Sequence, residues 1–331
     1  EVAENFVNGF SLISSNVASA YAGIFLYNAK TICSNNIISA GSASLGYSIS
    51  GIWDNGGNGF DNSLYFNTVS IGGSVSSGAS SSTSAVWCND DTSTRNYRNN
   101  IFVNTRTGGT LNSNTAIYLH SNTSITIDYN VYRFPEESVL GKITSTTYND
   151  LAAWKTGTGQ DANSLNTDPG FVAFGGASSN DYKTSVILQG INGTGVGFDY
   201  DEIMRQTTPQ IGAFEINDYI WVGTTSTNFA TATNWQNGLV PQNGSDITFA
   251  ADPAHDCYLD QARTIRHLIN AQSNDQFVLN GMELTMTGDF TLTNGAKVDA
   301  SSPGSELIMA GTEAQNLPVG AFVSSNLAGL T

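Results

Sequence analysis

Charged residues are scarce in this sequence, because Asp, Glu, Lys and Arg together make up only 12% of its 331 residues. The other polar residues are mostly Asn, Ser, Thr and Gly, which favour turns and strands and contribute little to a helix surface. Hydrophobic residues reach 40%, enough apolar material to bury a core. The composition therefore predicts an all-β protein.

Basic residues are especially few, with 12 Lys and Arg against 28 Asp and Glu and a net charge of -16. Phosphate backbones and anionic membrane surfaces repel such a chain, so we expect no nucleic-acid partner.

There is no run of about 18 apolar residues, so we expect no membrane insertion. No secretory signal opens the chain. It begins on ENFVNGF, inside a repeat, and we expect an interior piece of a longer protein.

Metal-ligating patterns are also missing. The three cysteines lack zinc-like spacing, and their odd number leaves at least one unpaired. The three histidines are scattered, without the spacing of a zinc site or a catalytic triad. We expect the cysteines to be buried structural thiols.

A repeat of one pattern is present instead. Four segments each open with a small residue, then an aliphatic one, then an aromatic one, and the openings begin at Gly23, Gly51, Ala85 and Ala116. They recur about every 30 residues, a period at which each repeat forms one turn of a solenoid and buries its apolar face only against its neighbours. The repeats predict a stack of β coils.

An asparagine precedes a strand-forming stretch in every repeat, at Asn36, Asn67, Asn100 and Asn130. Asparagine suits a corner, because it tolerates the left-handed conformation. In a stack, equivalent asparagines also line up, and we expect them to form a hydrogen-bonded ladder.

This pattern resembles the right-handed parallel β-helix (pectate-lyase-like) superfamily over residues 1–216. The stretch LAAWKTGTGQDANSLNTDPGFV and the later TPQIGAFE are similar to the closing region of β-helix proteins common among secreted and surface proteins of the Bacteroidetes. The matching residues are Trp154, Asp161, Asn163, Ser164, Asp168, Pro169, Phe171, Arg205, Ile211, Gly212, Ala213 and Glu215. SVILQGING departs from the family pattern, because it lacks the expected Ser-Pro. The resemblance implies a closing segment, from about residue 150, that covers the end of the stack.

A second module begins near residues 217–219. Its opening resembles a β-rich module that recurs in large secreted Bacteroidetes proteins, on Trp221, Gly223, Asn234, Trp235, Gly238, Pro241, Asp246 and Ile247. Short alternating strands separated by glycine turns follow. We expect a second β-solenoid over residues 219–331, truncated at its C-terminal end.

The stretch GGNGFD, residues 56–61, matches the first six positions of the calcium nonapeptide of solenoid proteins. The nonapeptide works in tandem copies, and this one occurs once, so a glycine-rich turn is the favoured interpretation. Asp54, Asn58 and Asp61 remain candidate calcium ligands, since Ca²⁺ takes clustered oxygens on a loop.

Two kinds of sugar chemistry remain open. A lyase needs a base, usually Lys or Arg, near a cation that neutralises a uronate, and Arg95 and Arg98 beside Asp90 in NDDTSTRNYR are the one cluster that resembles such a site. A hydrolase needs two carboxylates, for which Asp54 and Asp90 are candidates. The same four residues are our candidate carbohydrate-binding set. The simpler interpretation is a solvated loop whose opposite charges pair.

The aromatic residues of the repeat openings, Phe25, Trp53, Trp87 and Tyr118, form either a column inside the solenoid or a platform for sugar rings. Aromatics at identical coil positions usually stack in a core, so we favour the interior. An outward column would instead make carbohydrate binding the leading hypothesis.

Together these features predict a non-catalytic section of a large secreted or cell-surface protein, acting as an adhesin, stalk or filament element. The alternative is a polysaccharide lyase or hydrolase, or a carbohydrate-binding module, on the same scaffold. The expected partners are polysaccharides or cell-surface glycans and flanking domains of the same chain. The resemblance adds the type IX secretion machinery, and the expected location is extracellular or on the cell surface.

Overall fold

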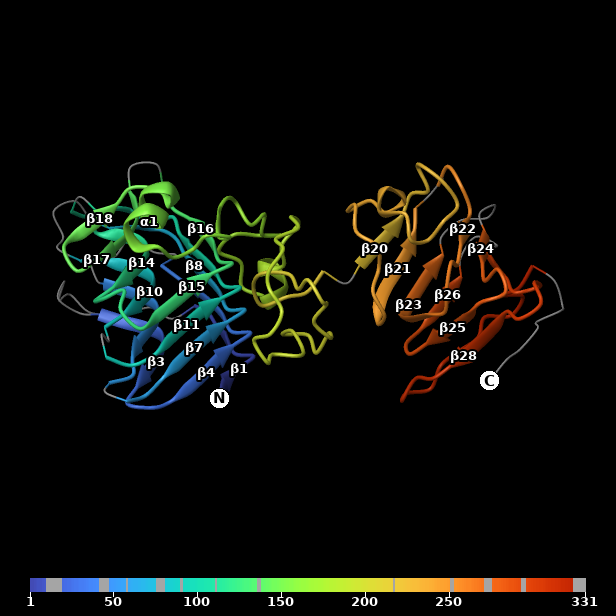
Figure 1. The fold of residues 1–331 in the computed structure, drawn as a ribbon, viewed down its shortest axis with the longest axis horizontal. Coiled ribbons are helices and arrows are strands. Elements are labelled where there is room, and N and C mark those ends of the chain that lie inside the picture. Colours follow the sequence, from blue (N-terminus) through green and yellow to red (C-terminus); the bar gives the residue numbers. More distant parts are fainter. Residues whose placement is uncertain are drawn as a thin grey trace. The chain divides into compact units, whose positions relative to one another are not determined.

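The computed structural model describes residues 1–9, 20–41, 48–57, 59–75, 81–89, 92–110, 112–135, 138–216, 218–250, 253–270, 276–292 and 296–323. The chain forms two compact units, Glu1–Glu215 and Ile216–Thr331. Their regular secondary structure is almost all β strand (Figure 1). Among the described residues, no helix is long and apolar enough to cross a membrane.

The first unit is a parallel β-solenoid, in which successive coils add strands to three sheets. Sheet 1 contains β1 (Val2–Ala3), β4 (Thr31–Ser34), β7 (Asn62–Tyr65), β11 (Arg95–Arg98) and β15 (Ile125–Asp128). Sheet 2 contains β3 (Ala20–Tyr27), β6 (Ser48–Asn55), β10 (Thr83–Cys88), β14 (Asn114–Leu119), β17 (Val139–Ile143) and β18 (Thr146–Tyr148). Sheet 3 contains β2 (Phe6–Val7), β5 (Ile37–Ala40), β8 (Thr68–Ile71), β12 (Ile101–Asn104), β16 (Val131–Arg133) and β19 (Leu165–Asn166). Two short strands, β9 (Ser74–Val75) and β13 (Thr107–Gly108), pair outside these sheets. The predicted all-β solenoid is confirmed.

The asparagine ladder is confirmed as well. The side-chain amide of Asn36 donates to Asn67 Oδ1 at 2.9 Å, Asn67 donates to Asn100 at 2.9 Å, and Asn100 donates to Asn130 at 3.0 Å. Asn5 adds a rung at one end by donating to Asn36 at 2.9 Å. All rungs run in one direction, so the amide dipoles are aligned and reinforce one another.

The left-handed corner lies one residue before each ladder asparagine rather than on it. Positive φ angles occur at Asn35 (54°), Phe66 (58°), Asn99 (61°) and Tyr129 (55°). The ladder asparagines that follow these four residues do not have a positive φ, and their side chains are fully buried. Because Phe66 and Tyr129 also adopt this conformation, stacking rather than local preference enforces the corner.

The end of the stack is finished by α1 (Leu151–Thr158) and by β18, which pairs antiparallel with β17. Asp150 caps the helix by accepting a hydrogen bond from the backbone of Ala153. Trp154 is fully buried and joins the apolar core of the coils. Its indole N–H donates to Asp161 at 2.7 Å, and this buried carboxylate also receives the last rung of the asparagine ladder at 3.4 Å.

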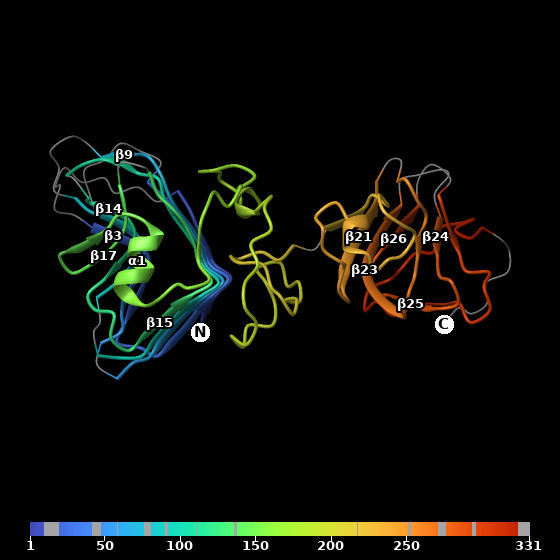
Figure 2. The ribbon, with the colours of Figure 1, turned by 45° about the horizontal axis from the view of Figure 1, so that its top comes forward.

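The rest of the closing segment does not cover the end of the stack, as the resemblance implied, but runs along the outside of sheet 3. It contains the short 3-10 turn η1 (Ser179–Tyr182), and the hydroxyl of Tyr182 hydrogen-bonds to Ser39 of β5. The backbone of Ala213 donates to Thr68 of β8 at 2.9 Å. Figure 2 shows this segment beside the stacked coils. Apolar side chains of sheet 3, such as Ile37 and Ile101, are buried against this segment.

Arg205 ties the closing segment to the coils. Its guanidinium donates to Asn35 Oδ1 at 2.8 Å, lies 3.4 Å from a Glu215 carboxylate oxygen, and sits 3.9 Å from the centre of the Phe66 ring. Burial raises the pKa of Glu215 to about 7, although the Arg205 charge acts in the opposite direction. Two residues of the closing segment, Arg205 and Glu215, therefore form one buried ion pair.

The second unit contains two parallel sheets around its own core. The larger has β20 (Asp218–Trp221), β21 (Ser245–Phe249), β23 (Arg263–Asn270), β25 (Glu283–Met286) and β28 (Glu306–Met309), with β26 (Phe290–Leu292) also pairing with β23. The smaller has β22 (Cys257–Tyr258), β24 (Gln276–Val278) and β27 (Lys297–Asp299), and a 3-10 turn η2 spans Ala232–Asn234. That this unit is a second solenoid stays a prediction.

Candidate functional site

The aromatic residues of the repeat openings form one column on the outer face of sheet 2. Phe25 pairs in register with Trp53, Trp53 with Trp87, and Trp87 with Tyr118. Phe25 is 50% exposed and the other three are half-buried. The expectation that this column lies in the core is wrong.

The pleat of the strands explains the outward direction. In each opening the aliphatic residue faces inward, and Ile52, Val86 and Ile117 are all fully buried in the core. Successive side chains of a strand point to opposite faces, so the aromatic residue that follows must face outward. The interior positions are already filled by the aliphatic column.

The rings of the column lie against one another. Trp53 and Trp87 are nearly parallel, with 5° between their planes and 4.9 Å between their centres. Since contacting ring atoms lie about 3.5–4.0 Å apart, these rings are laterally offset and leave part of their faces uncovered by each other. The ring centres of Phe25 and Trp53 are 4.7 Å apart. Tyr118 packs edge-on against Trp87, with 5.6 Å between the ring centres.

The two indole N–H groups add nothing to the surface. Nε1 of Trp53 and of Trp87 is buried, and neither has a hydrogen-bond acceptor among the described residues. Phe25, Trp53 and Trp87 therefore present carbon rings rather than donors, and the Tyr118 hydroxyl is the one polar group that the side chains of the column add.

A second outward column runs parallel to the first, two residues further along each strand. Its members are polar or phenolic and consist of Tyr27, Asn55, Asn89, His120 and Thr144. Asn55 is half-buried and the rest are exposed. Sheet 2 thus presents an apolar column beside a column of hydrogen-bonding groups, and only the strand register brings these residues together.

Two of the candidate sugar-binding residues, Asp54 and Arg95, lie inside the solenoid. Arg95 Nε is 2.8 Å from Asp54 Oδ2, and their side chains are 1% and 0% exposed. The Tyr97 hydroxyl and the Asn62 amide each donate to Asp54 at 2.6 Å. Burial and the Asp54 charge together raise the pKa of Tyr97 well above its usual value.

The other two members of that set are not brought to this pair. Arg98 is half-buried on β11, where alternation from the inward Arg95 directs it to the outer side of sheet 1. Asp90 lies outside the described residues. The expected solvated loop does not include Arg95, because β11 starts at this residue and turns its side chain inward.

The candidate calcium ligands are also separated. Asp54 is engaged inside the coil, and Asn58 lies outside the described residues. Asp61 accepts a hydrogen bond from the backbone of Thr94 at 2.9 Å and lies 4.0 Å from Lys30. Gly57 and Gly59 have positive φ angles, as a tight turn requires. Within the described ranges no three His, Cys, Asp or Glu side chains form a metal-binding group, and calcium stays a prediction.

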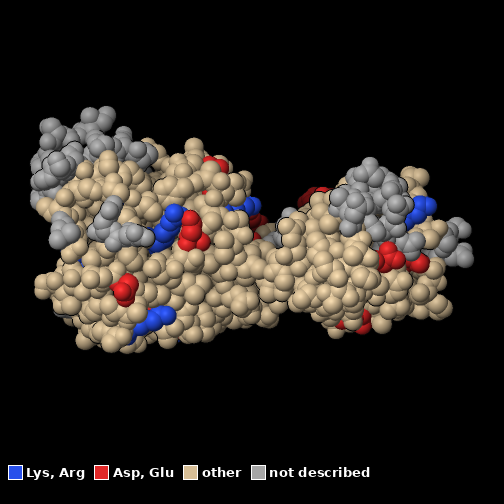
Figure 3. Space-filling view, turned by 90° about the horizontal axis from the view of Figure 1, so that it is seen from above, with Lys and Arg blue, Asp and Glu red and all other residues tan. Residues whose placement is uncertain are grey.

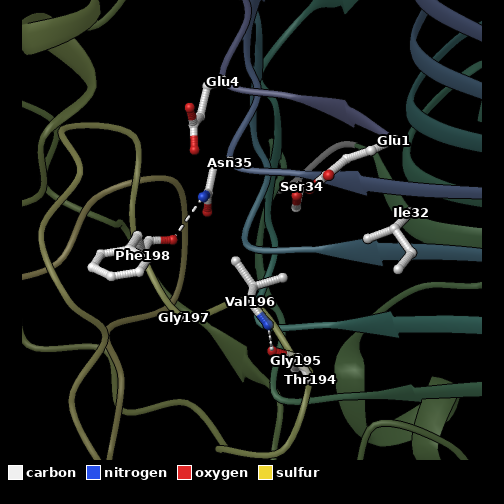
Figure 4. A pocket seen from close by; sticks show the side chains of 10 residues that line it. All are labelled: Glu1, Glu4, Ile32, Ser34, Asn35, Thr194, Gly195, Val196, Gly197 and Phe198. Atoms are coloured by element: carbon white, nitrogen blue, oxygen red, sulfur yellow. Dashed lines mark hydrogen bonds between the residues drawn. The ribbon is translucent and has the colours of Figure 1, made fainter.

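A shallow cleft of about 320 Å³ lies between sheet 1 and the closing segment. Figure 4 shows the ten residues that line it: Glu1, Glu4, Ile32, Ser34, Asn35, Thr194, Gly195, Val196, Gly197 and Phe198. The Asn35 amide donates to the Phe198 carbonyl at 2.8 Å and closes its base. This cleft adjoins sheet 1, so it is separate from the aromatic column on sheet 2.

No protein-family model, curated protein or solved structure matches this chain. Charge gives little further guidance, because Figure 3 shows only a few scattered charged side chains on the face it draws. The feature of the first unit that most clearly suits a ligand is therefore the outer face of sheet 2.

Proposed function

We propose that this chain is a non-catalytic section of a larger secreted or cell-surface protein, and that it binds glycan chains along the outer face of sheet 2. The observation that carries the proposal is the outward-facing column of Phe25, Trp53, Trp87 and Tyr118, of which Phe25 is exposed and the others are half-buried. Contiguous apolar surface on a folded protein usually marks an interaction site.

The chemistry of the two columns matches that of a sugar. A pyranose has apolar C–H patches, which pack on aromatic rings, and a rim of hydroxyl groups, which need hydrogen-bond partners. The aromatic column provides the first and the column of Asn55, Asn89 and His120 provides the second. The two run side by side, so one ligand contacts both.

The shape of the surface favours a chain over a single sugar. The columns follow the stacking direction of the coils, and neighbouring strands are about 4.8 Å apart, so the four aromatic rungs extend over roughly 14 Å. No enclosing pocket is needed for this kind of contact. An extended polysaccharide lying along the solenoid would meet several rungs at once.

The interior position of Asp54 and Arg95 supports binding over cleavage. A lyase needs a base that reaches the substrate, and a hydrolase needs two carboxylates across a groove. Asp54 is instead engaged by Arg95, Tyr97 and Asn62 in a buried network. A sugar on the surface has no route to these groups while the coil stays folded.

We further propose that the parent protein is a secreted or surface β-helix protein of the Bacteroidetes type, with pectate-lyase-like architecture and a second solenoid in series, exported by type IX secretion. The motif residues Arg205 and Glu215, which form a buried pair, support this. The parent should disappear from the medium and cell surface when that secretion system is disabled. Unchanged export would refute this part.

The binding proposal is tested on a glycan microarray with the intact chain. Wild type should bind one or more polysaccharides, and the double variant Trp53→Ala, Trp87→Ala should lose about tenfold or more in affinity, because apolar ring contact is removed. Trp53→Phe, Trp87→Phe should retain most of the binding, since the indole N–H groups are not used. Ile32→Ala, which trims an exposed apolar side chain on sheet 1, is the matched control. Binding that survives the alanine pair would refute the proposed surface.

A further inference from the structure

The aromatic column ends at a lysine. Lys142 of β17 lies in register with Tyr118 and occupies the next rung on the outer face of sheet 2. It is half-buried, and its strand partner on the other side is Thr147. The column thus changes from carbon rings to a cation within one strand spacing.

No described carboxylate pairs with Lys142. Its side chain forms no hydrogen bond with a described residue, and burial lowers its pKa. A nearby carboxylate would have raised that pKa by favouring the charged form. Lysine carries three donors and a compact charge, and partial burial without a partner is unfavourable for such a group.

Most other basic side chains of the first unit contact a described partner. Five contact carboxylates: Lys30 with Asp61, Arg95 with Asp54, Arg133 with Asp168, Lys183 with Asp201, and Arg205 with Glu215. Lys155 donates to two backbone carbonyls, at 3.0 and 3.1 Å. Among the described residues, Lys142 is distinguished by its place at the end of the aromatic column, where no described carboxylate pairs with it.

The surroundings of Lys142 are rich in hydroxyl groups. Thr144, Thr146 and Thr147 are all exposed on the hairpin formed by β17 and β18. Hydroxyls donate to anions and also to sugar oxygens. A cation, several hydroxyls and the Tyr118 ring together form a surface that suits a sugar carrying a negative group.

We propose that Lys142 binds an anionic substituent, a carboxylate or a sulfate, of the glycan that lies on the aromatic column. The inference rests on the proposed function and adds the ligand class to it. The anion would be held at one end of the column, so it also sets which way the chain lies.

The test uses the intact chain and one polymer backbone, chosen as any that the microarray shows to bind. Affinity gel electrophoresis compares the neutral polymer with its carboxymethylated and sulfated derivatives, which separates the two possible anions. Lys142→Gln should weaken binding to a charged derivative roughly threefold to tenfold and leave the neutral polymer unaffected. Lys142→Arg should keep the preference, because the charge is kept.

Lys30→Gln is the matched control, since it removes the same charge from an exposed residue outside sheet 2. Added salt should weaken the binding of the charged derivative to wild type more than the binding of the neutral polymer. Lys142→Gln should reduce that difference. If Lys142→Gln affects neutral and charged polymers equally, or wild type shows no preference for an anion, this inference is overturned while glycan binding stands. If no polymer binds, both proposals fall.

Discussion

Replacing Asn67 by alanine should destabilise the coils far more than replacing Asn5. Asn67 is fully buried in the middle of the asparagine ladder. Its side chain donates to the Cys33 carbonyl at 2.8 Å and to Asn100, and it accepts from the backbone and the side chain of Asn36. Alanine provides none of these contacts.

The magnitude follows from the groups left without partners. The Asn36 side chain keeps the carbonyls of Val2 and Ser34, so it is still bonded. The Cys33 carbonyl and the Asn36 backbone N–H lose the bonds they made to Asn67, and each buried orphan costs about 1–3 kcal/mol. We therefore expect Asn67→Ala to lower the free energy of unfolding of the first unit by about 2–4 kcal/mol.

Asn5→Ala is the matched control. Asn5 makes the end rung of the same ladder but is exposed, so water replaces its lost bonds and the expected cost is under about 1 kcal/mol. Urea unfolding of the intact chain measures both costs, and hydrogen exchange of the β5 and β8 amides assigns the effect to these coils. Equal costs for the two variants would refute the ladder as a source of stability.

Two further predictions concern the buried charges. Asp54→Leu should lower the free energy of unfolding by about 3–5 kcal/mol, because it leaves the buried Arg95 guanidinium without its carboxylate. Adding Arg95→Met should restore most of that loss, as measured by urea unfolding. A double variant whose loss equals the sum of the two single losses would contradict this. Glu215 has a folded-state pKa of about 7, above its value in an unfolded chain, so the folded state binds the extra proton. Its contribution is full below about pH 4.3 and is lost as the pH rises through about 7, so the first unit should unfold at lower urea concentration at pH 8 than at pH 5, and Glu215→Gln should flatten that slope. An unchanged slope would mean that another group titrates.

The closing segment shows where a motif is informative and where it is not. Its residues were recognisable, and Arg205 and Glu215 do meet. Its path along sheet 3 was not, because that path depends on contacts with Ser39 and Thr68, which lie more than a hundred residues earlier in the chain. A local pattern does not encode such distant partners.

The sequence by itself determined the solenoid and the asparagine ladder. Both follow from a residue pattern that recurs in every coil. Because the coils stack, residues at equivalent positions of the repeat become neighbours in the structure. The aromatic direction was also within reach, since the buried aliphatic residue before Trp53 or Trp87 forces the next side chain outward. Alternation of side chains along each repeat opening is enough to predict that the aromatic residue faces outward.

Only the tertiary structure decided what the charged residues do. Asp54 and Arg95 are 41 positions apart, yet they meet inside the stack because Asp54 projects into the coil from β6 of sheet 2 and Arg95 from β11 of sheet 1. Lys142 belongs to no visible repeat, but the register of β17 against β14 puts it next to Tyr118. Whether a charge is paired inside a coil or left alone on a face depends on which strands become neighbours, and that is fixed by the packing of the whole chain.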